Sequence, residues 1–349
     1  MRFKKSLVVF ILNLILVYSL FYITYKRYDV VQYGQGDLEY FEMVKHPINP
    51  NPEIVGSKER YRILTPLFVT LMDKVPVYQT DIAAQLSLED KAIFFHYLLF
   101  NYLILALVSA IYFYLAHEVY GFSSGLSYLG TMLFLLSFHI VRSGFISIDA
   151  PLTHLFIVLG LLCKKYNRFW LFIPVIVLGV LQKESVILIL GLIFFLEFVF
   201  QKRSFSELKW LVALVLPTLL YIAFVKLVPI PRLLGHAGSE GSLLAHGLRI
   251  FDPDSYTLRF VANTFLGYGS LIACLGLHGL LRLKNKVVDF PMSQLWIFPV
   301  LIFISLAIVV DGGNEGRVAF YAFPVYLIYQ LSVLKTFFKT YPAYDMLSS

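Results

Sequence analysis

Long apolar runs, separated by short polar and basic stretches, dominate this chain of 349 residues. A helix needs about 20 mainly apolar residues to cross a hydrocarbon layer of roughly 30 Å. The pattern therefore predicts about ten membrane-spanning helices, at residues 6–25, 92–116, 125–145, 149–163, 169–182, 186–200, 210–228, 260–281, 294–310 and 318–334. The first run is too long for a signal peptide and is followed by no small-residue cleavage site, so we expect a retained anchor.

Composition excludes most soluble classes. Hydrophobic residues make up 58% and charged residues 15% of the chain, whereas soluble domains have roughly 45–50% and about 25%. This excess argues against soluble enzymes, disulfide scaffolds and disordered regulators. Cys163 and Cys274 both fall in apolar runs, so no disulfide framework is suggested. We expect an all-α integral membrane protein with one polytopic domain at 1–340 and a short cytoplasmic tail at 341–349.

Basic residues predict the orientation of the helices, because lysine and arginine concentrate in cytoplasmic loops. With ten spans and both termini in the cytoplasm, every basic cluster falls on the cytoplasmic side. These clusters are Arg2/Lys4/Lys5, Lys164/Lys165/Arg168, Lys202/Arg203/Lys209, Arg282/Lys284/Lys286 and Lys335/Lys339. Topology thus accounts for the net charge of +7, and no nucleic-acid partner is expected. The compact size favours a bacterial plasma (inner) membrane.

Residues 169–200 are predicted to form a hairpin of two short helices rather than one long helix. A single helix would place Lys183 and Glu184 near the bilayer centre, where a charge costs roughly 2.5–3.5 kcal/mol. An arm of about 14 residues rises only about 21 Å. The turn should therefore lie below the outer surface and line a wet cavity open to the outside.

The predicted outer side collects acids and bases, which suggests a site for a charged substrate. Two outer segments are long, 26–91 and 229–259, and within the first we expect residues 60–78 to lie at the interface as an amphipathic segment. In the same segment Asp37 and Glu39 are candidate acids. A carboxylate there could act as a general base, or it could be a solvated loop acid.

Several cations on this side could contact phosphate, since guanidinium groups match phosphate oxygens. For Arg232, His236 and Arg249 the alternative is anchoring at the lipid headgroups. For Arg317 it is an ion pair with Glu315 or Asp311, and for Lys183 a neutralising pair with Glu184. Asp149, on a tight outer turn, completes the candidate set. No acidic cluster or histidine pair has the spacing of metal ligands.

This arrangement resembles the C superfamily of glycosyltransferases (GT-C), membrane enzymes that use lipid-phosphate-linked sugars. Protein O-mannosyltransferases, GPI mannosyltransferases and bacterial lipid A aminoarabinose transferases are members. The resemblance rests on Gly36-Asp37-Leu38-Glu39-Tyr40, Arg60-Tyr-Arg-Ile-Leu-Thr-Pro66, Ile148-Asp149-Ala150-Pro151, Gly179-Val-Leu-Gln-Lys183-Glu184-Ser185 and Glu315-Gly-Arg317. These motifs are short and together span most of the membrane core, as in the compact bacterial branches.

The resemblance implies that Asp37 is the catalytic base, because it matches the acid of the first outer loop. Many members carry two adjacent acids, whereas Leu38 separates Asp37 from Glu39 here, so Glu39 is only a possible second acid. The implied donor is a polyprenyl-phosphate-linked sugar, and the acceptor is a glycan, a lipid or a protein. Transfer would invert the anomeric carbon, and no metal or other cofactor is implied.

Other functions remain open from the sequence. A transporter or flippase would place binding groups near the midplane and often shows internal repeats, and we find no repeat. A polysaccharide polymerase or ligase would also use outward-facing arginines. A catalytically silent scaffold could keep the same fold.

Overall fold

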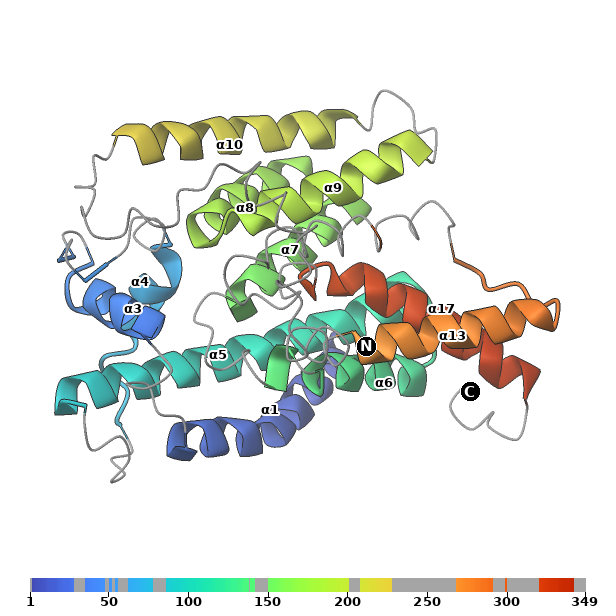
Figure 1. Ribbon diagram of the computed structural model, residues 1–349, viewed down its shortest axis with the longest axis horizontal. Helices are drawn as coiled ribbons and strands as arrows, with labels where there is room; N and C mark the ends of the chain where they lie inside the picture. Colours follow the sequence, from blue (N-terminus) through green and yellow to red (C-terminus); the bar gives the residue numbers. More distant parts are fainter. Residues whose placement is uncertain are drawn as a thin grey trace, which may run out of the picture.

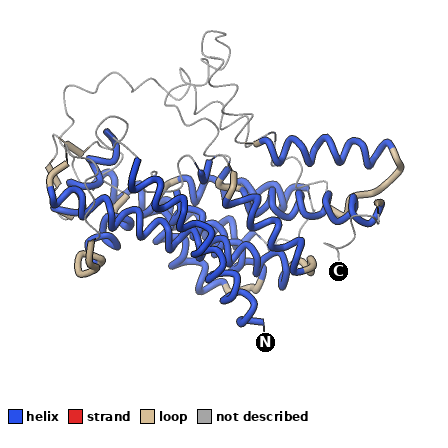
Figure 2. Tube along the Cα trace, turned by 90° about the horizontal axis from the view of Figure 1, so that it is seen from below, coloured by secondary structure: helices blue, strands red, loops and turns tan. Residues whose placement is uncertain are grey.

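The computed structural model describes residues 2–27, 35–47, 50–51, 54–55, 62–77, 86–137, 139–141, 150–200, 208–227, 268–290, 299 and 320–341. Within these ranges the protein is all-helical, with eleven α-helices, one π-helical segment and no strand (Figures 1 and 2). The predicted all-α class is confirmed.

The elements are α1 (Arg2–Arg27), α3 (Gln35–Lys45), α4 (Leu64–Leu71), α5 (Leu88–Tyr114), the π-helical η2 (Leu115–Val119), α6 (Ser124–Leu135), α7 (Ala150–Lys165), α8 (Phe169–Gln182), α9 (Ser185–Phe200), α10 (Leu208–Leu227), α13 (Gly269–Leu283) and α17 (Phe323–Thr340).

From α5 to α10 successive helices alternate in direction between two ends of a bundle, whereas α13 and α17 run parallel to each other. We call one the Lys183 end; it holds α3, α4 and the turn between α8 and α9, and α3 and α4 lie to the left in Figure 1. We call the other the basic end. Its lysines are Lys5, Lys164, Lys165, Lys209, Lys284, Lys286, Lys335 and Lys339.

The hairpin predicted for residues 169–200 is present. α8 and α9 fold back on each other, so that the rings of Phe172 and Phe194 lie 5.8 Å apart, while Gly179 packs directly against Val186 next to the turn. Lys164 and Glu197 form an ion pair where the hairpin returns to α7. A single long helix is therefore excluded, since these pairs would lie far apart along it.

α1 packs along α5 in the opposite direction. The Asn13 amide donates to the Ser109 hydroxyl at 2.7 Å, and the Tyr102 hydroxyl donates to the Leu14 carbonyl at 2.6 Å. The Phe21 ring closes the same seam against Tyr102, with centroids 5.4 Å apart. One buried hydrogen bond, one partly buried hydrogen bond and a tilted aromatic contact hold the long helices in register.

α6 is shorter than predicted. The apolar run 125–145 favours one span, but the helix ends at Leu135 and a turn follows. The Ser137 hydroxyl accepts from the Ile140 amide at 3.4 Å, and the Ser137 carbonyl accepts from the Val141 amide at 2.9 Å. Serine offers the backbone a local partner in place of the helical one, so Ser137 caps a new turn and interrupts the helix.

Local sequence explains other helix boundaries. The Ser87 and Ser123 hydroxyls cap α5 and α6 by accepting from the backbone amides of Asp90 and Leu126, respectively. At the basic end, three tight turns each contain a residue with positive φ: Gly121 (71°), Asn167 (52°) and Asn285 (57°). Glycine and asparagine adopt this left-handed conformation most readily, so they end the preceding helices.

Two helices, Lys5–Lys26 and Leu88–Val119, are long and apolar enough to cross a membrane by length and composition. Large apolar side chains also cover the outward surfaces of α1 and α10. On α1 and α10 the exposed fractions of fourteen such side chains lie between 44% and 70%: Leu7, Val8, Ile11, Leu12, Ile15, Tyr18, Tyr22, Ile23, Val212, Val215, Leu216, Leu219, Leu220 and Ile222. These surfaces face away from the bundle core.

Gly179 allows α8 to approach its neighbours closely, so Gly179→Ala should destabilise the fold. A β-carbon there would lie 2.8 Å from Val186 Cγ1 and 3.2 Å from Phe156 Cβ, and neither atom moves freely. We expect a loss of about 1–3 kcal/mol in the free energy of unfolding, visible as a lower melting temperature. The control is Gly276→Ala, because nothing lies within 4 Å of its β-carbon position. Equal melting temperatures for the two variants would contradict this packing.

Candidate functional site

Lys183 occupies the break between α8 and α9. Its backbone is extended, with φ −166°, while its amide donates to the Gly179 carbonyl at 2.8 Å, so α8 ends at this residue. The side chain is 5% exposed. Its ammonium donates to the Tyr321 hydroxyl at 3.2 Å and lies 5.3 Å from the centre of the Tyr321 ring. The hairpin turn thus carries a buried cation against a tyrosine next to α17.

Glu184, the next residue, is joined to the first outer segment. Its Oε1 lies 3.0 Å from Nη2 of Arg62, and Nη1 of Arg62 donates to the Tyr40 hydroxyl at 3.5 Å. The Tyr97 hydroxyl of α5 donates to the Tyr40 carbonyl at 3.2 Å. Arg62 therefore bridges the hairpin turn to α3.

A second link fastens α4 to the tip of α8. The Thr65 hydroxyl donates to Oε1 of Gln182 at 3.0 Å, and both residues are fully buried. Among the neighbours of Thr65 on α4, Leu64, Pro66 and Val69 are buried and Leu71 is exposed. At eight residues, α4 is about 12 Å long and too short to cross a bilayer, which agrees with the prediction of a non-spanning segment at 60–78.

Aromatic rings surround the interior next to Lys183. His154 of α7 is buried, and a hydrogen bond of 3.1 Å joins its Nδ1 to the Tyr112 hydroxyl. Its ring lies 5.1 Å from the Tyr321 ring and 5.6 Å from the Phe320 ring, between centroids. The Tyr321 ring therefore lies close to both an imidazole and the lysine ammonium, and His154 and Lys183 are both buried.

An ion pair holds the end of α3 against the start of α5. Lys45 Nζ lies 2.8 Å from Oδ1 of Asp90. Burial lowers the pKa of Lys45, but the hydrogen bond to Asp90 and the attraction of nearby carboxylates outweigh it, so the pKa is raised above its usual value. This pair helps to fix α3, and with it the backbone of Asp37, at the Lys183 end.

The described candidates gather at one end of the bundle. Lys183 and Glu184 lie at the hairpin turn, and Glu39 lies on α3, which Arg62 joins to that turn. Asp37 lies in the first turn of α3, and its side chain falls outside the description. On a helix, positions two apart diverge by about 200°, so positions 37 and 39 fall on different faces of α3. Asp149, Arg232, His236, Arg249 and Arg317 lie outside the described residues.

Sequence reasoning missed several members of this cluster. Arg62 was named as a charge of the amphipathic segment and within the motif Arg60-Tyr-Arg-Ile-Leu-Thr-Pro66, with no role assigned to it. Tyr40 was named only as the last residue of the motif that begins at Gly36. Tyr321 gave no signal, because tyrosines are frequent in the chain and its partner lies far away in sequence.

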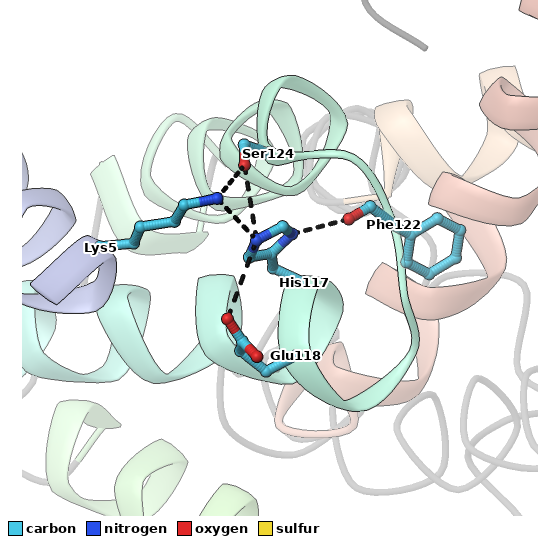
Figure 3. A network of polar contacts seen from close by, with 5 residues as sticks. All are labelled: Lys5, His117, Glu118, Phe122 and Ser124. Atoms are coloured by element: carbon cyan, nitrogen blue, oxygen red, sulfur yellow. Dashed lines mark hydrogen bonds and ion pairs between the residues drawn. The ribbon is translucent and has the colours of Figure 1, made fainter. Parts of the chain in front are cut away.

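A separate polar cluster lies at the basic end (Figure 3). Lys5 Nζ lies 3.3 Å from Nε2 of His117 and 3.4 Å from the Ser124 hydroxyl, while Nδ1 of His117 lies 2.8 Å from the Phe122 carbonyl. Since a carbonyl only accepts, Nδ1 carries the proton and Nε2 accepts from Lys5. This network ties the start of α1 to the turn between η2 and α6. In the described part of the chain, no group of three or more His, Cys, Asp or Glu could hold a metal ion.

Comparisons with family models, with curated proteins and with solved structures give no match for this chain. Function is therefore inferred from the residues themselves.

The contact between Thr65 and Gln182 should hold α4 in place, so Thr65→Val should loosen it. Losing a buried hydrogen bond costs about 1–3 kcal/mol, and we expect faster amide hydrogen exchange across residues 64–71. Thr218→Val is the control, because the Thr218 hydroxyl only donates to the Leu214 carbonyl of its own helix. Unchanged exchange in the Thr65 variant would show that the contact does not anchor α4.

Proposed function

We propose that the chain is a multi-pass membrane glycosyltransferase whose active site lies at the Lys183 end. The observation that carries the proposal is the buried Lys183 at the helix break between α8 and α9, which Glu184 and Arg62 join to the helix bearing Asp37. Irregular backbone within a membrane is found where it is buried in protein or lines a cavity. An ionisable group held there is a candidate for binding a charged substrate.

Membrane residence is supported by the surfaces and the ends of the bundle. The outward sides of α1 and α10 expose a continuous set of large apolar side chains, which lipid would cover. The helices collect lysines at the basic end, as expected for a cytoplasmic side. Lys183 and Arg62 would then face the extracytoplasmic side.

The proposed reaction needs two kinds of group. A polyprenyl phosphate leaves readily once fixed cations meet its charge, and a cation in a low-dielectric site does this more strongly than one in water. Lys183 fits that role. The acceptor hydroxyl needs a base within hydrogen-bond reach, and Asp37, one helical turn before Tyr40, is our candidate.

In this transfer the acceptor oxygen forms a bond to the anomeric carbon, while the bond from that carbon to the phosphate oxygen breaks. The hydroxyl proton passes to the carboxylate of Asp37, and the phosphate leaves with the bonding electron pair. Attack opposite the leaving group inverts the anomeric carbon. Arg317, Arg249, Arg232, His236 and Asp149 are further proposed contacts for the lipid phosphate or the acceptor.

A polysaccharide polymerase or ligase is the second candidate, favoured by the Arg62 guanidinium beside the hairpin turn. Such an enzyme would depend on this arginine more than on Asp37.

Transfer of a radiolabelled sugar from its polyprenyl phosphate by the purified protein tests the base. Asp37→Asn should lower the rate by about 10²–10⁴-fold, the usual contribution of a general base. Asp73→Asn, a change of the same chemistry after α4, should retain the wild-type rate. Wild-type turnover by Asp37→Asn would refute the assignment, whereas activity that fails only with Arg62→Gln would favour the polymerase or ligase.

Topology can be tested with single cysteines in a protein whose Cys163 and Cys274 are replaced by alanine. Cysteines at His46 and Glu184 should react with a membrane-impermeant maleimide added to intact cells. Cysteines at Asn167 and Lys209 should react only after the membrane is permeabilised. All four side chains lie on exposed positions, so poor reactivity would not stem from burial. Labelling of position 167 in intact cells would overturn the orientation.

A further inference from the structure

A pocket of about 520 Å³ opens at the basic end, far from Lys183. One wall is a stripe of α17 that includes Ser332, Lys335 and Lys339; the second is the segment after α13, with Lys286 and Asp289. The turn after η2 closes the third side with Tyr120 and Phe122. Pockets of roughly 300–1,000 Å³ are typical of small-ligand sites, so this one is large enough for a phosphate-bearing headgroup.

The pocket is positively charged. Lys286, Lys335 and Lys339 line it together with a single acid, Asp289. Among the described residues none of the three ammonium groups forms an ion pair, although Lys335 lies 5.5 Å from the centre of the Phe122 ring. Elsewhere at this end Lys164 is paired with Glu197 and Lys209 is bonded to Asn167. The pocket therefore offers three cations to an anion.

Apolar side chains beside the pocket indicate where that anion comes from. Leu283 and Val287 are 82% and 87% exposed, and they alternate with Arg282, Lys284 and Lys286. Apolar side chains interleaved with cations are typical of a segment at the boundary between headgroups and acyl chains. A soluble phosphate would gain nothing from Leu283 and Val287, whereas a lipid would cover them.

We infer that this pocket binds the phosphate headgroup of an anionic phospholipid in the leaflet at the basic end, with Lys286, Lys335 and Lys339 around the phosphate and Leu283 and Val287 against the acyl chains. The site is separate from the proposed active site. It shares with the proposed function only the membrane, because lipid binding can be measured without sugar transfer.

The test is binding of phosphatidylglycerol to the purified, detergent-solubilised full chain. Native mass spectrometry counts the bound lipid molecules, and the rise in melting temperature with added lipid reports the affinity. Wild-type protein should bind phosphatidylglycerol at least about tenfold more tightly than phosphatidylcholine. Combined Lys286→Gln, Lys335→Gln and Lys339→Gln should weaken phosphatidylglycerol binding about tenfold or more, since each cation contributes attraction to an anionic headgroup.

The matched control is combined Lys165→Gln, Arg168→Gln and Lys209→Gln, which removes the same charge from exposed positions at the same end, outside the pocket. It should change the affinity less than about twofold, and an equal loss in both triple variants would overturn the site. Asp289→Asn should tighten phosphatidylglycerol binding, because it removes the one acid that lines the pocket. Asp289 is exposed, so this variant tests the pocket even where the triple variant does not fold. Competition by inorganic phosphate at equal concentration would assign the pocket to a soluble anion instead of a lipid.

Discussion

The burial of Lys183 is the constraint on which the arrangement of this protein depends. An ammonium taken from water into a helical bundle is costly unless polar or aromatic groups surround it. Here the hydroxyl and ring of Tyr321 do so, and Tyr321 stands 138 positions further along the chain. Because the lysine lies in the break between α8 and α9, its contact with Tyr321 holds the start of α17 against the tip of α8. The break, the cation and α17 are therefore one structural unit.

The same turn orders the first outer segment. Gln182 and Glu184 flank the buried lysine, and each holds one part of that segment: Gln182 binds Thr65 on α4, and Glu184 binds Arg62. In the pair with Arg62 the Glu184 side chain is half exposed, which screens the interaction, whereas the contact of Gln182 with Thr65 is fully buried. The buried contact anchors the segment, and the ion pair adds a second link between Arg62 and the hairpin turn.

Most features that depend on residues close together in the sequence could be predicted, whereas side-chain contacts between residues far apart in the sequence could not. The hairpin 169–200 was predictable because the cost of a charge at midplane is local to that stretch, and α8 occupies 169–182 as expected. The end of α6 was not, because the capping serine at 137 outweighs an apolar run that favours a longer helix. Asp37 and the hairpin turn were expected to converge, but the role of Arg62 was missed because its partner is 122 positions away.

α17 connects the two ends of the bundle, and its own sequence explains how it serves both. From Phe323 to Val333 every residue is buried, so this part packs on all sides and fixes the helix in the bundle. Charged residues occur only in the final turns, at Lys335 and Lys339, where they line the pocket at the basic end. A helix buried along its middle and charged at one extremity cannot shift along its axis without exposing apolar surface or burying a lysine. Its position should thus be set by both ends together: by the contact of Tyr321 with Lys183, and by the two lysines that must stay outside the apolar interior.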